Sequence, residues 1–262
     1  MNRTISINTH LAFRFAQPAN VILQIEAAEV PGQIIHAQTL EGLRDDQCVE
    51  AEHNAGTRRL VRADGFFDCN YSAMVEVTRG DVDLTMLNAT PLTDLPGDAV
   101  SSLMPSRYCQ GEMFDAPRRE IFGTLTGGAL IAAVSRWIAD NFTYAPGASD
   151  TETTAVDSFM QRRGVCRDYA HVLIAFARSA AIPARMASVY GPHVSPQDFH
   201  AIAEVYLDGA WRLVDPTEMS APSETAIIGV GRDAADVAFM TSFGFAAFEA
   251  MQIEVSRAGN AP

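Results

Sequence analysis

One stretch of the chain combines residue types that support nucleophilic chemistry: Gly164-Val165-Cys166-Arg167-Asp168. The almost wholly apolar run that follows it predicts a buried helix over residues 166–181. A thiol in the first turn of a helix lies beside unpaired backbone N–H groups, which stabilise a thiolate and, during a reaction, an oxyanion. Val165 is therefore a candidate oxyanion residue. Free cysteine is also among the most buried residue types, so Cys166 taken alone favours a structural role.

A thiol nucleophile needs a base, and the base needs an orienting partner. Among the six histidines, His200 opens a predicted strand in which His200 and Ile202 share one face. If Asp208-Gly209 forms a two-residue hairpin turn, Asp215 pairs with Ile202 and shares that face; a three-residue loop would place it on the other. His171 follows Cys166 by about 140° around a helix, which predicts that it faces away from the thiol.

The elements that must position these residues divide the chain in two. Short β-branched or aromatic runs separated by turn signals, including a predicted hairpin at Asp64-Gly65, indicate an antiparallel β-sandwich over residues 1–98. The segment 88–98 has the composition of a linker. Residues 99–262 form the second predicted domain, an α+β unit with helices at 128–141, 151–161 and 166–181 and strands at 185–190, 200–207 and 211–214.

Composition excludes several function classes. The net charge of −13 argues against sequence-independent nucleic-acid binding. All 19 cationic side chains are arginine, which excludes Schiff-base lysine chemistry and a P-loop lysine. The four cysteines form no CxxC pair, and we expect no metal and no cofactor. The longest uncharged run, residues 121–135, is too short to span a bilayer, and the first residues lack the apolar core of a secretory signal. We expect no membrane partner and a cytoplasmic location.

Four motifs in order, Gly164 to Asp168, Ile182-Pro183-Ala184-Arg185, His200-Ala201 and Asp215-Pro216-Thr217, resemble the bacterial branch of the transglutaminase-like superfamily. The resemblance implies a papain-like core in which a helix carries the cysteine and an antiparallel sheet carries the histidine and aspartate. It also implies that Cys166, His200 and Asp215 form a catalytic triad.

The same resemblance gives weaker indications for other positions. Tyr144 resembles an upstream tyrosine that donates to the oxyanion or to the substrate; alternatively it is a buried aromatic with a satisfied hydroxyl. Ile202 stands where an aromatic residue is often found, which alters the pocket wall. The segment Gly231 to Asp236 is similar to one that borders the cleft, unless it is a capped helix start on the surface. No calcium loop of the Asp-x-Asp-x-Asp-Gly type is present.

The sequence therefore predicts thiol-dependent acyl chemistry on a peptide, a protein or a small amide. Hydrolysis is favoured because no acceptor-amine site is visible. Acyl transfer to an amine, as in transglutaminases or arylamine acyltransferases, stays open. So does a non-catalytic binding module on a degenerate transglutaminase fold. Neither the substrate nor the oligomeric state follows from the sequence.

Overall fold

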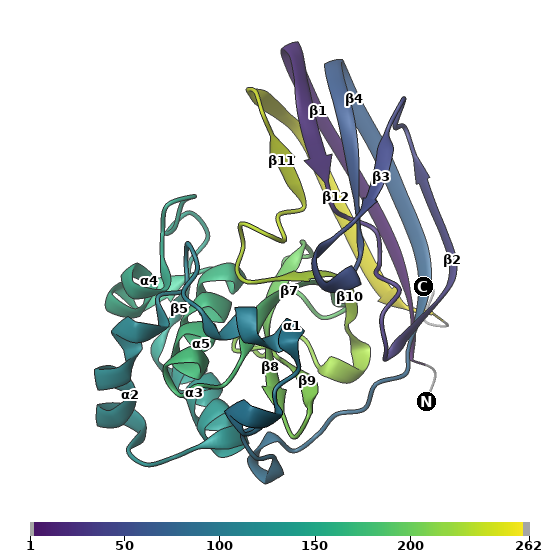
Figure 1. Cartoon of the computed structure of the whole chain (residues 1–262). Helices are drawn as coiled ribbons and strands as arrows, with labels where there is room; N and C mark the ends of the chain where they lie inside the picture. The colour runs from purple at the N-terminus through teal and green to yellow at the C-terminus, as the bar shows by residue number, and fades with distance from the viewer. Residues whose placement is uncertain (1–2, 259–262) are drawn as a thin grey trace.

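Two antiparallel sheets and a group of helices make up the fold in the computed structural model, which describes residues 3–258 (Figure 1). The larger sheet has the order β11-β1-β4-β2, with β12 also paired to β1 and β3 to β4. Side chains of β1 alternate between buried and outward positions, as in Ile5, Ile7 and Leu11, because successive residues of a strand face opposite sides. Its strands are β1 (Thr4–Leu23), β2 (Gln33–Glu41), β3 (Gln47–Glu50), β4 (Thr57–Val77), β11 (Met240–Ser242) and β12 (Ala246–Arg257).

The β region is a single sheet, where the sequence predicted a sandwich of two. Its second layer comes from the smaller sheet, since Tyr190, Ala226 and Ile228 pack into the same apolar cluster. The strands β11 and β12, which lie within the predicted second domain, pair with residues 5–15 and 21–23 of β1. This pairing covers a strand edge that would otherwise be open, and it joins the two ends of the chain.

The predicted hairpin at Asp64-Gly65 is wrong, because β4 continues through it. Gly65 pairs with Phe15, beside the point where the β1–β4 register shifts. The positive φ of Gly65 (65°) is absorbed by this irregularity rather than by a turn.

The smaller sheet, called the core sheet here, has the order β10-β7-β8-β9 and carries the predicted hairpin. Asp208 and Gly209 both have positive φ, as a two-residue hairpin turn requires, and Ala203 pairs with Val214. The predicted register is therefore confirmed, and it delivers Asp215 to the end of β8 at which the strand begins. The strands are β7 (Ala184–Tyr190), β8 (His200–Leu207), β9 (Ala210–Val214) and β10 (Ala226–Gly231).

The helices lie on one side of the core sheet, away from the larger sheet (Figure 1). The predicted helices 128–141 and 166–181 are present as α3 and α5. The predicted helix at 151–161 begins later, after a capping box at Thr154. The helices are α1 (Gly97–Val100), α2 (Asp115–Phe122), α3 (Gly127–Asn141), α4 (Ala155–Gln161) and α5 (Cys166–Ser179), and a two-stranded parallel pair joins β5 (Thr143–Tyr144) to β6 (Arg163–Gly164).

Helix α5 is the centre of the helical part. Its apolar side chains are buried, and Phe176 makes edge-to-face contacts with Phe114, Phe122 and Trp137. The opposite side of α5 packs on β7 and β8. A helix held on both sides in this way fixes the position of its first residue, Cys166, relative to the core sheet.

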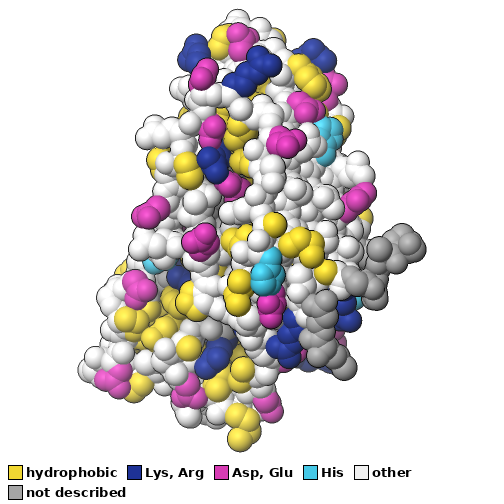
Figure 2. Space-filling view, turned by 90° about the vertical axis from the view of Figure 1, so that its right-hand side faces the viewer, with side chains coloured by type: hydrophobic (Ala, Val, Ile, Leu, Met, Phe, Trp, Pro, Cys, Tyr) yellow, Lys and Arg dark blue, Asp and Glu magenta, His cyan; other side chains and the backbone are white. Residues whose placement is uncertain are grey.

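On the face shown in Figure 2, arginine and acidic side chains are interspersed.

Within residues 3–258 no single helix is long and apolar enough to cross a membrane. The segments Gly111–Phe122 and Gly127–Asn141 satisfy the length and composition together, but they are bent by 88°.

Candidate active site

Cys166 is the first residue of α5, and a buried carboxylate shapes the turn before it. Oδ2 of Asp168 accepts hydrogen bonds from the Val165 N–H (2.8 Å) and from the Ser149 hydroxyl (2.5 Å). A Cβ at Gly164 would lie 2.5 Å from the Asp168 side chain, so only glycine fits there. Asp168 thus caps the helix at its third residue and holds the chain in a tight entry to Cys166.

His200 and Asp215 form a buried hydrogen-bonded pair. The distance from His200 Nε2 to Asp215 Oδ2 is 2.8 Å, and the two side chains are 1% and 2% exposed. The carboxylate is itself oriented: Oδ1 accepts from the N–H and hydroxyl of Thr217, and Oδ2 accepts from the N–H and hydroxyl of Ser220. With Nε2 committed to Asp215, the imidazole ring has one orientation and leaves Nδ1 for a different partner.

The thiol of Cys166 lies beside the His200 ring, whose Nδ1 makes no hydrogen bond within the described residues. The charges of the His200–Asp215 pair follow from these contacts. Burial by itself lowers the pKa of His200, but the Asp215 hydrogen bond and the adjacent Cys166 outweigh it and raise the pKa to about 10. Burial likewise raises the pKa of Asp215, yet the hydrogen bonds from His200 and Thr217 bring it below its usual value. At neutral pH the pair is therefore an imidazolium and a carboxylate.

Cys166 and His200 open into a cleft of about 560 Å³. Part of its wall is the segment that leads from β10 to β11, and another part is the region before α2. Phe199 and Phe239 stack in this cleft with ring centroids 4.7 Å apart. The remaining lining residues are Arg107, Tyr108, Thr151, Arg167, Met186, Ser188, Ala201, Ala234, Ala235, Val237, Ala238, Met240 and Thr241. Among residues 3–258 no cluster of three histidine, cysteine or acidic side chains has the geometry to hold a metal ion.

This arrangement can be compared with known proteins. Residues 121–216, which contain the cysteine, the histidine and the aspartate, match the model of the transglutaminase-like superfamily. This segment resembles a transglutaminase-like core. The whole-chain fold, mixed helix with antiparallel sheet, agrees with that assignment and with the fold class expected from the sequence.

Individual relatives extend the comparison beyond the transglutaminase-like core. A candidate cysteine protease from Cytophaga hutchinsonii, solved by crystallography, is 29% identical, with a TM-score of 0.92 over 98% of this chain and 91% of that one. An uncharacterized protein of Mycobacterium leprae is 31% identical over 117 residues, which span 42% of that protein. The periplasmic domain of TgpA from Pseudomonas aeruginosa is 18% identical over 80% of this chain and 76% of that one, with a TM-score of 0.44.

Tyr144 lies against Cys166. Its strand β5 pairs with β6, so that Tyr144 sits opposite Gly164, two residues before Cys166. The hydroxyl is in hydrogen-bond contact with both the backbone and the thiol of Cys166, and burial, followed by the charge of Cys166, raises its pKa above the ordinary tyrosine value. The role expected for Tyr144 from the sequence, as a donor to the oxyanion or to the substrate, stays a prediction.

The structure does not support the roles proposed from the sequence for Val165, at the oxyanion, and for Ile202, in the pocket wall. The Val165 N–H is taken by Asp168, so it is not free to bind an oxyanion. Ile202 is 1% exposed and packs with Ala187 and Val189 in a separate apolar cluster, and it does not line the cleft. Ile202 shares a face of β8 with His200, but it lies further along the strand, where it packs in that cluster and not in the cleft.

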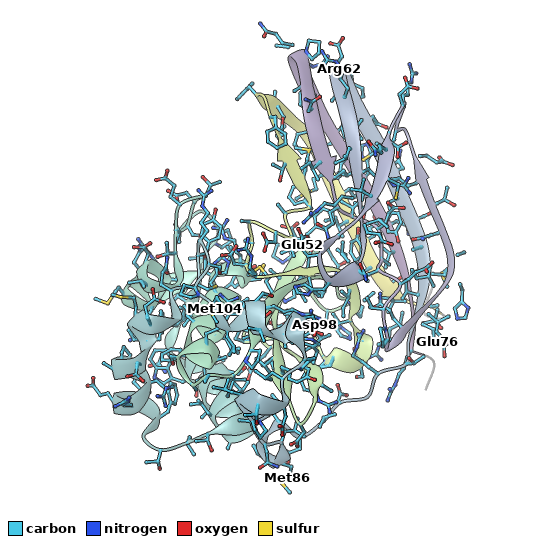
Figure 3. All side chains as sticks on the ribbon, viewed as in Figure 1. Glu52, Arg62, Glu76, Met86, Asp98 and Met104 are labelled. Atoms are coloured by element: carbon cyan, nitrogen blue, oxygen red, sulfur yellow. The ribbon has the colours of Figure 1, made fainter. Side chains whose placement is uncertain are left out.

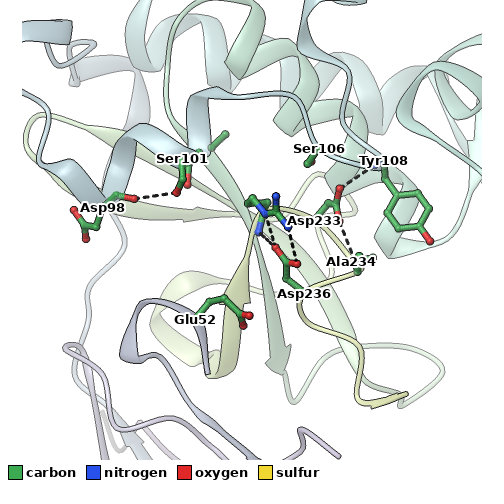
Figure 4. Close-up of polar contacts among 12 residues, drawn as sticks. Glu52, Asp98, Ser101, Ser106, Tyr108, Asp233, Ala234 and Asp236 are labelled. Atoms are coloured by element: carbon green, nitrogen blue, oxygen red, sulfur yellow. Dashed lines mark hydrogen bonds and ion pairs between the residues drawn. The ribbon is translucent and has the colours of Figure 1, made fainter. Parts of the chain in front are cut away.

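His171 faces away from the thiol, as the sequence predicted. Its ring instead contacts the segment that forms part of the cleft wall. Its Nε2 accepts the N–H of Ala234 (3.2 Å), and burial lowers its pKa to about 3, so the ring is neutral. The Asp233 carboxylate accepts a hydrogen bond from the Tyr108 N–H (Figure 4). It accepts a second one from the Ala235 N–H. The segment Gly231 to Asp236 therefore borders the cleft through Ala234 and Ala235 and is not a surface helix start.

Sequence reasoning missed the aromatic and cationic lining of the cleft. Phe199, Phe239 and Arg107 come from loops whose patterns carry no regular period, and they meet only after the chain has folded. A signal was available at one point: Phe199 directly precedes the proposed base and so had to lie near the site.

Proposed function

We propose that this protein is a cysteine hydrolase that cleaves an amide or peptide bond in a peptide, a protein or a small amide. The observation that carries the proposal is the buried His200–Asp215 pair, whose other ring edge faces Cys166 in an open cleft. A binding module has no need for a thiol, an imidazole and a carboxylate in this register. The candidate cysteine protease with the same fold over nearly the whole chain supports this choice.

The contacts allow a complete reaction cycle. The Cys166 thiolate attacks the carbonyl carbon, and a C–S bond forms as the carbonyl electron pair moves to oxygen. The His200 imidazolium then gives its proton to the leaving nitrogen, the C–N bond breaks, and a thioester remains. Water gives a proton to His200 and attacks the thioester, the C–S bond breaks, and the free acid leaves. Asp215 orients the ring and stabilises its positive charge throughout.

The developing oxyanion needs donors other than Val165. The Tyr144 hydroxyl and the backbone of Cys166 lie together at the thiol. We assign the oxyanion to this position, where the Tyr144 hydroxyl would donate to it.

The distinction between an enzyme and a binding module rests on thiol reactivity. We expect iodoacetamide at neutral pH to alkylate Cys166 at least about tenfold faster than Cys48, the exposed cysteine, because imidazolium stabilises a thiolate. Cys69 and Cys109 stay unlabelled in the native protein, since burial raises the pKa of Cys69 to about 12 and that of Cys109 still further. Peptide mapping by mass spectrometry measures the four rates. His200→Ala should remove the advantage of Cys166, and equal rates for Cys48 and Cys166 in the wild type would favour the binding module.

Hydrolysis and acyl transfer give different products. Efficient transfer requires a bound acceptor, because water at about 55 M competes for the thioester. The chain contains no lysine, so it cannot cross-link to itself through lysine side chains. We expect free acid as the main product even with millimolar primary amine present, measured by mass spectrometry of the products. If amide adducts dominate at low amine concentration, the result would contradict hydrolysis and favour acyl transfer.

A further inference from the structure

An arginine at the cleft is held in place without a carboxylate partner. The Arg107 guanidinium lies over the Tyr108 ring at 5.1 Å, and that ring stacks on His171 with centroids 5.1 Å apart. The Tyr108 hydroxyl donates to the Thr151 carbonyl at 2.7 Å, which fixes the ring from its other end. Within the described part of the chain no acidic side chain forms an ion pair with Arg107, and its side chain is exposed. The cation is thus pre-positioned and remains free to bind an anion.

Arg167 adds a second positive charge to the same end of the cleft. Its Nη2 donates to the Asp150 carbonyl (2.8 Å) and to the Ser149 hydroxyl (3.2 Å). Because Asp150 and Thr151 are adjacent in the chain, these contacts place Arg167 close to the Tyr108–Thr151 contact. Asp168 lies 3.5 Å from the guanidinium and offsets part of its charge. The Nε of Arg167 is buried and has no hydrogen-bond partner.

The lining of the cleft is positively charged, whereas the chain as a whole is negatively charged. The chain carries a net charge of −13, yet the described cleft lining contains two arginines and no aspartate or glutamate. The carboxylates nearby are committed elsewhere: Asp168 to the helix entry, and Asp233 to two backbone N–H groups. Asp198 accepts a hydrogen bond from the Phe199 N–H and lies outside the lining.

We propose that the Arg107–Arg167 end of the cleft binds a carboxylate of the substrate, so that the preferred acyl substrate carries a carboxylate close to the scissile bond. Arginine binds carboxylates through paired, charge-assisted hydrogen bonds, and a cleft with low-dielectric walls strengthens that attraction. The stacked Phe199 and Phe239, which line the same cleft, take an apolar group. Arg167 directly follows Cys166 and Phe199 directly precedes His200 in the chain, so both groups lie near the reacting carbonyl.

This inference rests on the proposed function, but a probe of the thiol tests it without a known substrate. Iodoacetate and iodoacetamide both alkylate Cys166, forming a C–S bond as iodide leaves, and they differ by one negative charge. We measure the ratio of the two rate constants, iodoacetate over iodoacetamide. Arg107→Gln should lower this ratio about threefold to tenfold, and 0.5 M salt should lower it in the wild type. Arg107→Lys should retain most of the ratio because it keeps the charge.

The matched control is Arg62→Gln, which removes the same charge at the far end of the larger sheet (Figure 3). The iodoacetate-to-iodoacetamide ratio of Arg62→Gln should equal that of the wild type. This result would show that the effect of Arg107 is local and does not come from the net charge of the protein. A ratio unchanged by Arg107→Gln, with Cys166 still highly reactive toward iodoacetamide, would overturn the inference alone. A Cys166 no more reactive than Cys48 would instead overturn the proposed function.

A second experiment distinguishes a side-chain carboxylate of the substrate from its C-terminal carboxylate. Peptide pairs that differ only by glutamate against glutamine, or by a free against an amidated C-terminus, are compared for cleavage by the wild type and by Arg107→Gln. A preference for the charged member of either pair, lost in the variant, supports the inference and shows which carboxylate binds. Peptides cleaved without any preference for charge would contradict it.

Discussion

Replacement of Cys166 by alanine is expected to lower kcat/KM by at least about 10⁴-fold, once an acyl substrate has been found. The effect is large because the thioester cannot form, and His200 and Asp215 have no alternative nucleophile to activate. The protein should fold normally, because Cys166 is only half-buried and begins a helix whose apolar contacts lie further along it. Turnover of a peptide library by purified wild type and variant measures the effect, with circular dichroism to check folding.

The matched control for this substitution is Cys48→Ala. Cys48 is exposed on β3, in the larger sheet, and takes no part in the cleft. Its removal should leave turnover within about twofold of the wild type, as is usual for a surface substitution. If Cys166→Ala retained full activity, the thiol mechanism would be contradicted, because no other cysteine lines the cleft among the described residues.

Replacement of Asp215 by asparagine should lower kcat by about 10² to 10⁴-fold with a smaller effect on KM. Asparagine nearly preserves the shape of the side chain but removes the negative charge that holds the imidazolium. The pKa of His200, raised to about 10 in the wild type, should fall, and the alkaline limit of activity should move to lower pH. Pre-steady-state and pH–rate measurements on the same substrate test both parts.

The stability of the same variant tests the electrostatic cause independently of turnover. A histidine whose pKa is higher in the folded than in the unfolded protein contributes stability that is complete below about pH 6.5. That contribution is lost as the pH rises toward about 10. The difference in Tm between wild type and Asp215→Asn should therefore be largest near pH 6 and narrow as the pH rises. A difference that stays constant from pH 6 to pH 10 would mean that Asp215 acts through packing alone.

Asp198→Asn is the control for both measurements. Asp198 influences His200 through its charge, but it hydrogen-bonds the Phe199 N–H and not the ring. The variant should change kcat by no more than about threefold, which matches an exposed charge screened by solvent. An effect as large as that of Asp215→Asn would show that any nearby carboxylate suffices.

The sequence by itself determined the elements that carry the proposed nucleophile, base and orienting group. The apolar run after Cys166 specifies a buried helix. The dipeptide Asp208-Gly209 predicts the register that brings Asp215 to His200 if the turn has two residues, and the structure confirms that it has. Both are local signals, because helical periodicity and turn chemistry depend on residues a few positions apart. The resemblance to the superfamily singled out Tyr144, and the structure placed it beside Cys166.

Only the tertiary structure decided what surrounds these residues. The Val165 N–H is lost to Asp168, Ile202 turns into the interior, and β11 and β12 complete a sheet begun by the first residues of the chain. The stack of Arg107, Tyr108 and His171 joins segments that are far apart in sequence. Such contacts depend on which surfaces meet when the chain packs, and no pattern within one segment encodes its partner in another.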